Sequence, residues 1–235
     1  MMSNLNLAIN LLEASRINKV KSYLFTSTYG VYGPDKEMKE ENVWKTFPSE
    51  HDKYAGWAKR IAELQIEAYR KEFKFDGLHI VRPGNIFGPY SNFNPKNSMV
   101  VSSLIKRITD EENPLKVWGD GTAIRDFIFS EDVADGMLNI VRKNIQVPIN
   151  LGSGKGYSIK KLVQTICKSK HILSKPKVIY DTSKPSGDKK RILNISKAKK
   201  FKLYKISNFQ TSIDKTIVWY KNNIKKTKLR YNFFK

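Results

Sequence analysis

The chain has 235 residues, 40% of them hydrophobic and one of them Cys, with 43 Lys and Arg against 22 Asp and Glu. These values exclude a disordered, collagen-like or disulfide-stapled protein and indicate a globular chain long enough to bury a sizeable core. No run of about 18 apolar residues could cross a membrane, and the first residues lack the pattern of a signal peptide. The sequence therefore predicts a cytoplasmic protein.

The excess of positive charge lies in the last third of the chain. Residues 1–150 carry 20 basic and 19 acidic side chains, whereas residues 151–235 carry 23 basic and 3 acidic ones. We favour a solvated lysine-rich face over nucleic-acid binding as the reason for this excess, because no zinc-finger, RNP or helix-turn-helix pattern points to nucleic acid. Cys167 and the 3 scattered His residues show no metal-ligand spacing. Neither a metal nor nucleic acid is expected as a partner.

Helices and strands are expected to alternate along the chain. Apolar positions at helical spacing indicate a first helix, capped by Ser3 or Asn4 and ending near Ser15. Ser130, followed by two acidic residues, is expected to cap a later helix. Alternation of this kind is typical of an α/β fold with a doubly wound parallel sheet. Further strands are expected at 20–26, 77–81, 115–118, 126–129 and 147–151, and further helices at 52–73, 97–111, 158–170 and 210–222.

Three glycine-rich segments are candidates for contact with a ligand. The segment 152–156 lacks both the third glycine of a dinucleotide fingerprint and the Lys-Ser/Thr ending of a P-loop. We therefore interpret it as a structural loop that leads to a helix capped by Ser158. The segments 29–33 and 83–89 instead follow two strands at their carboxyl ends, where open α/β sheets bind ligands. These two segments are the better candidates.

Polar side chains from these strand ends and from the helix between them could meet in one site. The first strand ends at residues 26–28 (Thr-Ser-Thr), Lys59 lies in the long helix, and Asn85 follows the next strand. A hydroxyl and an ammonium suit a site where a sugar hydroxyl loses a proton while its carbon gives up hydride. Such residues also occur together without function in many folds.

Five motifs in a fixed order extend this interpretation. Together they resemble the NAD(P)-dependent epimerase/dehydratase family, the extended short-chain dehydrogenases that act on nucleotide sugars, and most of all its GDP-L-fucose synthase members. The resemblance spans roughly residues 4–191. The motifs are Phe25–Pro34, Gly56–Lys59, Arg82–Pro89, Trp118–Phe127 and Ser130–Ala134.

The resemblance implies a Rossmann-type fold, NAD(P) as cofactor and a nucleotide-diphosphate sugar as substrate, with a GDP-sugar favoured. It implies that Thr28 binds the reacting sugar oxygen and that Lys59 holds the nicotinamide ribose. Arg107, Trp118 and Arg125 could instead be a surface charge, a core aromatic and a strand-edge ion pair. The implied cofactor contacts are Thr26, Ser27, Lys59, Pro83, Asn85 and Ile86, and the implied substrate contacts are Asn85, Arg107, Trp118, Arg125 and Arg191.

The resemblance also implies a division of the chain. Residues 1–90 are expected to form the C-terminal part of the Rossmann-type domain, to which later strands return. Residues 91–224 are expected to form mainly the nucleotide-sugar-binding subdomain, and residues 225–235 a basic tail.

Because of two departures from the family pattern, the sequence does not decide whether this chain turns over a substrate. The family's catalytic Tyr stands four residues before the Lys, where this chain has Ala55, and Tyr54 is five residues before Lys59. Five residues rotate a side chain by about 140° around a regular helix, so Tyr54 is a candidate acid only if the helix begins at that turn. Fucose synthases also carry a His where this chain has Met99. The alternative to an enzyme is a truncated, non-catalytic protein that binds a nucleotide sugar.

The family's first strand and glycine-rich phosphate turn have no counterpart before Asn4. We therefore expect an incomplete Rossmann-type sheet with an exposed edge, in a chain that forms a homodimer or binds a partner covering that sheet.

Overall fold

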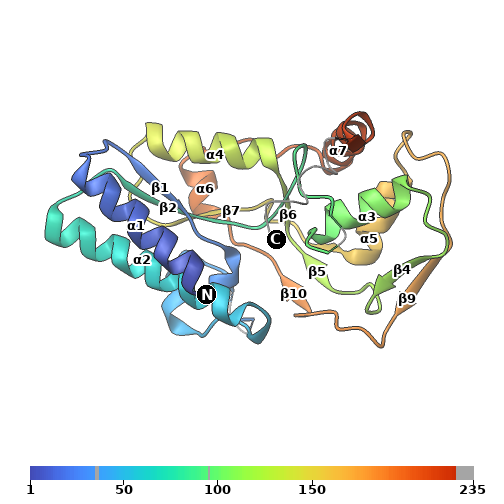
Figure 1. Ribbon diagram of the computed structural model, residues 1–235, viewed down its shortest axis with the longest axis horizontal. Helices are drawn as coiled ribbons and strands as arrows, with labels where there is room; N and C mark the ends of the chain where they lie inside the picture. The colour runs from blue at the N-terminus through green and yellow to red at the C-terminus, as the bar shows by residue number, and fades with distance from the viewer. Residues whose placement is uncertain (35–36, 95, 226–235) are drawn as a thin grey trace.

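The computed structural model describes residues 1–34, 37–94 and 96–225, and it shows an α/β protein with mainly parallel strand pairs (Figure 1). Apart from its first residue, the expected basic tail 225–235 lies outside the described residues. No helix in the described part is long and apolar enough to cross a membrane. The α-helices are α1 (Met2–Ile17), α2 (Lys53–Phe73), α3 (Val100–Thr109), α4 (Ser130–Arg142), α5 (Ile159–Cys167), α6 (Ser196–Lys200) and α7 (Phe209–Asn222), and the 3-10 helices are η1 (Tyr29–Val31), η2 (Glu40–Lys45) and η3 (Glu50–Asp52).

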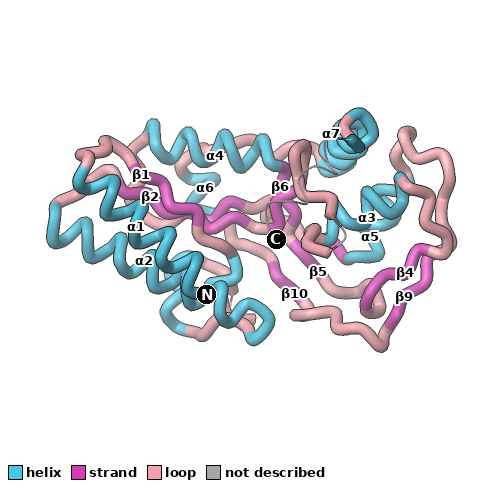
Figure 2. The backbone as a smooth tube through the Cα atoms, viewed as in Figure 1, coloured by secondary structure: helices cyan, strands magenta, loops and turns pink. Residues whose placement is uncertain are grey.

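The strands form four small sheets, with orders β1-β2-β7, β10-β5-β8, β3-β6 and β4-β9. All strand pairs are parallel except β5 with β8. Figure 2 shows the β4–β9 pair at the end of the molecule opposite to α1 and α2. The strands are β1 (Tyr23–Thr26), β2 (Leu78–Pro83), β3 (Asn85–Phe87), β4 (Leu115–Trp118), β5 (Ile124–Arg125), β6 (Phe127–Phe129), β7 (Ile149–Leu151), β8 (Tyr157–Ser158), β9 (Val178–Asp181) and β10 (Lys190–Arg191).

Strand β2 is the centre of the first sheet and is buried along its whole length. Leu78 and Ile80 pack into a core with α1 and α2, whereas Val81 packs into a second core with α4 and α6. Because successive side chains of a strand point to opposite faces, this split places helices on both sides of the sheet. The sheet is therefore doubly wound, as the helix and strand alternation predicted.

A third core lies beyond the first sheet. It joins α3, α5 and α7 to the β3–β6 and β4–β9 pairs through apolar and aromatic side chains such as Phe87, Phe129 and Ile217. The stacked aromatic contacts of this core include Phe93 with Trp219 and Tyr157 with Phe209. This second half carries Arg107, Trp118 and Arg125, which the family resemblance linked to the nucleotide sugar.

The predicted elements occur in the predicted order, but the sequence did not predict the short elements β3, β8, β9, β10 and α6, and two of the predicted helix caps are wrong. The first helix begins at Met2 without a side-chain cap, so neither Ser3 nor Asn4 caps it. Ser130 is likewise the first helical residue of α4 and not its cap. Ser158 is confirmed as a cap, because its hydroxyl accepts a hydrogen bond from the Lys161 amide. A cap needs extended backbone before the helix, and neighbours decide where that backbone begins.

Candidate functional site

The carboxyl ends of β1 and β2 lie side by side. The Ser27 amide donates to the Val81 carbonyl at 2.8 Å, and the Gly84 amide donates to the Leu151 carbonyl of β7 at 2.9 Å. Parallel pairing in this register brings three polar segments to one edge of the sheet. We call them the strand-end cluster: residues 26–28, Lys59 and residues 83–86.

Lys59 reaches this edge from α2. Its Nζ donates to the Thr26 carbonyl at 2.8 Å and lies 4.7 Å from the centre of the Phe25 ring. Burial lowers the pKa of Lys59, and the nearby carboxylate of Glu63 opposes that shift. An ammonium has three N–H donors, so two remain for a ligand.

Thr28 and Ser27 supply hydroxyls at the same edge. The Thr28 hydroxyl oxygen accepts from the Gly30 amide at 3.1 Å, which caps η1 and leaves the O–H free to donate. Ser27 is buried, and its hydroxyl has no hydrogen-bond partner among the described residues. A buried hydroxyl without a partner is costly, and a bound ligand at this position would satisfy it.

Tyr29 is a site residue that sequence reasoning missed. Its hydroxyl donates to the Asn85 side-chain oxygen at 2.9 Å, and the Asn85 amide group donates in turn to the Asp126 carbonyl at 3.0 Å. Burial raises the pKa of Tyr29, against the effect of nearby Arg191. The signal was available, because Tyr29 directly follows Thr28 in the first motif.

Arg191 connects the second half of the protein to Tyr29. It is 4% exposed, its guanidinium lies 4.4 Å from the centre of the Tyr29 ring, and it donates to the Tyr29 carbonyl at 3.1 Å. It also forms ion pairs with Asp52 and Asp188. Its Nε–H has no partner among the described residues. Most of its donors are therefore used within the protein, which fixes Tyr29 against the strand ends.

A buried ion pair holds α2 in place behind the cluster. Arg82 and Glu63 are 2% and 1% exposed and are joined by two hydrogen bonds of 3.0 and 2.6 Å. Arg82 also donates to the Tyr32 hydroxyl at 2.9 Å. Glu63 is one helical turn from Lys59, so this pair fixes the rotation of the helix that carries Lys59.

Tyr54 does not share a helix face with Lys59. Helix α2 begins at Lys53, so both residues lie within regular helix, about 140° apart around its axis. Tyr54 is 69% exposed and falls on an outer row of apolar side chains that continues with Ile61 and Leu64. Ala55 occupies the position one turn before Lys59.

The arginines and the tryptophan of the predicted substrate site form a second group. Arg107 pairs with Glu112 and donates to the Lys116 carbonyl at 2.6 Å, two residues before Trp118 at the end of β4. Trp118 is 62% exposed. We call Arg107, Trp118 and Arg125 the arginine–tryptophan cluster.

Arg125 links this group to the strand-end cluster. It is paired in register with Arg191 across β5 and β10, and it donates to the carbonyls of Asp188 and Ser186 at 2.6 and 3.0 Å. Gly119, next to Trp118, is close to Ser186 as well. The segment 186–191 therefore joins the two clusters.

The glycine-rich segment 152–156 has a structural role. The amides of Ser153 and Gly154 donate to the buried carboxylate of Asp126 at 2.8 and 3.1 Å, so neither is available to a phosphate. A Cβ at Gly152 would lie 2.6 Å from the same carboxylate, which explains the glycine. Among the described residues, no group of three or more His, Cys, Asp or Glu could hold a metal ion.

Comparison with known proteins gives a family match. The model of the NAD dependent epimerase/dehydratase family matches residues 1–152. GDP-L-fucose synthase of Escherichia coli (strain K12) is 27% identical over 238 residues, covering 94% of this chain and 73% of that protein. GDP-L-colitose synthase of Yersinia pseudotuberculosis is 27% identical over 232 residues, covering 94% of this chain and 74% of that protein.

Solved structures agree on the fold. The crystal structure of a GDP-L-fucose synthetase from Naegleria fowleri bound to NADP superposes with a TM-score of 0.85 at 24% identity, over 94% of this chain and 73% of that one.

Proposed function

The chain belongs to the NAD dependent epimerase/dehydratase family, and we propose that it is an epimerase-, dehydratase- or reductase-type oxidoreductase of a GDP-linked sugar. The names of its relatives support the GDP-sugar, since they include a GDP-L-fucose and a GDP-L-colitose synthase. The observation that carries the proposal is the strand-end cluster. There, the Lys59 ammonium donates to the Thr26 carbonyl at 2.8 Å, two residues before Thr28, whose hydroxyl oxygen accepts from the Gly30 amide.

The strand-end cluster fits a nicotinamide cofactor. Two unused donors on Lys59 suit ribose hydroxyls, and the unpartnered hydroxyl of Ser27 suits a polar group of the ligand. Residues 83–86, which include Asn85, flank the same edge. A bound NAD(P) supplies hydride exchange with a sugar carbon.

The chain's own residues handle the sugar oxygen. Thr28 donates its free O–H to that oxygen and so orients it. Lys59 provides positive charge that stabilises negative charge on the oxygen. Tyr29 is a positioning residue, because its hydrogen bond fixes the Asn85 side-chain amide. Arg191 acts one step further away by fixing Tyr29.

The arginine–tryptophan cluster supplies the contacts for the nucleotide. An exposed indole at Trp118 offers a face for a base or sugar, and the guanidinium N–H groups of Arg107 and Arg125 that the protein leaves unused can donate to diphosphate oxygens. Arg107 and Arg125 already use donors within the protein, so their geometry is set before a ligand arrives. The proposed division follows from this: residues 1–90 hold the cofactor and residues 91–224 mainly the nucleotide sugar.

One observation favours a second candidate function, a protein that binds a nucleotide sugar without turning it over. Ala55 stands where the family Tyr would share a face with Lys59, and Tyr54 points to another face of α2. Such a site lacks the tyrosine acid needed for turnover but keeps the groups that bind the nucleotide sugar.

Two measurements on the purified 235-residue chain test both functions. The first is a binding titration with a panel of GDP- and UDP-linked sugars, and the second is an assay of NADPH oxidation. We expect a GDP-sugar to bind and to be turned over, with Thr28→Val losing about a hundredfold in kcat and Thr28→Ser recovering most of it. Binding without turnover selects the second candidate. If no nucleotide sugar binds, both functions are wrong.

We also propose that two copies associate through α1 and α2. Leu7 and Leu11 are exposed one turn apart on α1, and Ile61 and Leu64 are exposed on α2, which packs beside α1 (Figure 1). Apolar rows on two neighbouring helices can pair with the same rows of a second copy in a two-fold four-helix arrangement.

A cytoplasmic location stays a prediction.

The oligomeric state tests this surface directly. Sedimentation of the full chain should give a dimer, and Leu11→Glu with Leu64→Glu should give a folded monomer. The control replaces two exposed polar residues of the same helices, Ser3→Glu and Glu72→Gln. A monomeric wild-type chain contradicts the proposal.

A further inference from the structure

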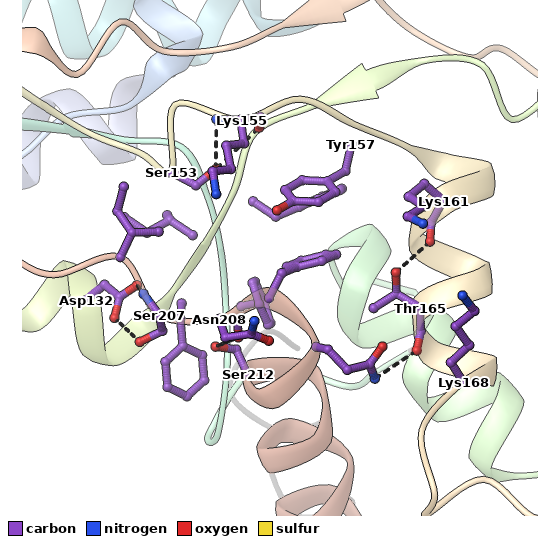
Figure 3. Close-up of a pocket in the computed structure, with 17 residues that line it drawn as sticks. Asp132, Ser153, Lys155, Tyr157, Lys161, Thr165, Lys168, Ser207, Asn208 and Ser212 are labelled. Atoms are coloured by element: carbon purple, nitrogen blue, oxygen red, sulfur yellow. Dashed lines mark hydrogen bonds between the residues drawn. The ribbon is translucent and has the colours of Figure 1, made fainter.

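A cavity of about 500 Å³ lies between α5, α7 and the β3–β6 pair (Figure 3). It shares no lining residue with the strand-end cluster or with the arginine–tryptophan cluster. Its size is within the range of about 300–1,000 Å³ that is typical of small-molecule sites. We call it the lysine pocket; the residues that matter here are Asp132, Lys155, Tyr157, Lys161, Lys168 and Phe209.

Three lysines line this cavity from two sides. Figure 3 shows Lys155 coming from the glycine-rich loop, Lys161 from α5, and Lys168 from the residue that directly follows this helix. None of the three ammonium groups has an acidic or hydrogen-bonding partner in the part of the chain that the structure describes. Some lysines elsewhere are paired, such as Lys215 with Glu131, but many exposed lysines of the described chain resemble these three in having no partner. All three lysines are exposed at the cavity, and an anion bound there would be attracted by their positive charges.

Several other polar side chains that line the cavity already have hydrogen-bond partners within the protein. Asp132 is the acidic residue of the lining, is 4% exposed, and accepts hydrogen bonds from the Ser207 amide and hydroxyl at 2.9 and 2.5 Å. The Thr165 hydroxyl donates to the Lys161 carbonyl at 2.8 Å, and the Gln210 amide donates to the Thr165 carbonyl at 3.1 Å. The lysine ammonium groups, in contrast, are free to donate to a ligand.

The floor of the cavity is aromatic. Tyr157 stacks on Phe209, with ring centres 4.1 Å apart and planes at 24°. Phe87 and Phe127 also contact Phe209 and line the same cavity. The Tyr157 hydroxyl has no hydrogen-bond partner among the described residues, so it can donate to a ligand. A ring placed on such a surface gains stacking energy.

The N-terminus of α7 adds positive potential at the same place. This helix of 14 residues begins at Phe209, and its cap, Asn208, accepts from the Thr211 amide at 3.1 Å. Asn208, Phe209 and Gln210 all line the cavity. The positive end of the helix dipole therefore lies at the cavity wall, in addition to the three lysines.

We propose that the lysine pocket binds a small phosphorylated ring compound, a nucleoside phosphate or a sugar phosphate. The phosphate lies among Lys155, Lys161 and Lys168, and the ring contacts Tyr157. The proposal is independent of the function proposed for the strand-end cluster. It gives a role to part of the positive charge that the sequence concentrates after residue 150.

Calorimetric titration of the full chain tests the proposal with three probes: AMP, glucose 1-phosphate and inorganic phosphate. We expect saturable binding of AMP or glucose 1-phosphate that is at least about tenfold tighter than binding of inorganic phosphate. Replacing all three pocket lysines by Ala should weaken binding by at least about a hundredfold, because three charged donors to the phosphate are lost. If AMP is the ring compound that binds, the ligand is a nucleoside phosphate. If glucose 1-phosphate binds instead, the ligand is a sugar phosphate.

Matched variants separate this site from general attraction by a basic protein. Lys160→Ala with Lys175→Ala and Lys177→Ala removes the same charge from exposed positions outside the cavity and should leave binding unchanged. Arg125→Gln should also leave it unchanged, because Arg125 belongs to the other site. Tyr157→Leu should weaken the ring compounds about tenfold but not inorganic phosphate.

Three results overturn the proposal. They are equal binding of inorganic phosphate and the ring compounds, equal loss in the pocket and control variants, and no saturable binding of any probe by folded protein.

Discussion

The strand-end cluster and the lysine pocket treat positive charge in opposite ways. Around the strand ends, Arg82 is paired with Glu63, Arg191 with Asp52, and the Lys59 ammonium with the Thr26 carbonyl. In the lysine pocket, Lys155, Lys161 and Lys168 have no partner among the described residues.

This difference separates two ways of building a site. Cations anchored by protein acceptors have fixed positions, so they can orient a reacting group. Cations without partners keep more rotamer freedom, and they attract an anion without fixing its geometry. We therefore expect the strand-end cluster to orient a reacting group and the lysine pocket to bind an anion.

The largest expected effect is on the scaffold of the strand-end cluster. Glu63→Ala leaves Arg82 buried without its partner and should lower the free energy of unfolding by about 3–5 kcal/mol, measured by urea denaturation. The exposed Glu72→Ala on the same helix should change it by less than about 0.5 kcal/mol. A small loss at Glu63 would mean that anchoring of the cluster does not depend on this pair.

The next effect is on Lys59. Lys59→Met should weaken binding of NADPH by about ten- to a hundredfold, because a charged donor is lost. Lys59 is charged below its pKa, and burial lowers that pKa. Binding should therefore weaken as the pH rises, and at a lower pH than an ordinary lysine would give. In Lys59→Arg, the loss of NADPH binding should move to higher pH, because arginine stays charged there. If both proteins lose binding at the same pH, Lys59 is not the residue responsible for the loss.

A smaller effect distinguishes the two tyrosines. Tyr29→Phe removes the hydrogen bond to Asn85 and should raise the dissociation constant of the GDP-sugar about fivefold. Tyr54→Phe should change neither binding nor turnover, since Tyr54 lies on the outer face of α2. Loss of turnover in Tyr54→Phe with normal binding would restore Tyr54 as the acid and overturn this part of the comparison.

The smallest effect concerns the helix that carries Lys161 and is directly followed by Lys168. Ser158→Ala removes the cap of α5 and should cost about 1 kcal/mol in thermal unfolding. Ser196→Ala, at the exposed start of α6 where no side-chain cap forms, is the control. Equal effects would show that the cap does not hold α5 and its lysines in place.

The sequence by itself determined the fold class, the order of the long elements and the family. The 21-residue helix α2 can be predicted from its helical spacing of apolar residues, and the buried strand β2 from its continuous apolar run. Both patterns are local signals in the sequence. The five motifs could be found in the same way, since each is a short continuous segment.

Only the tertiary structure decided which side chains meet. Tyr29 and Asn85 are 56 residues apart, and Arg191 is 162 residues from the Tyr29 carbonyl that it contacts. The register of β5 with β10 sets Arg125 beside Arg191. This pairing cannot be predicted from the sequence of either strand, because each strand has two residues. The lysine pocket likewise joins a loop, two helices and a strand pair from separate parts of the chain. Such contacts depend on packing between distant segments, whereas a single sequence encodes mainly the local preferences of each segment.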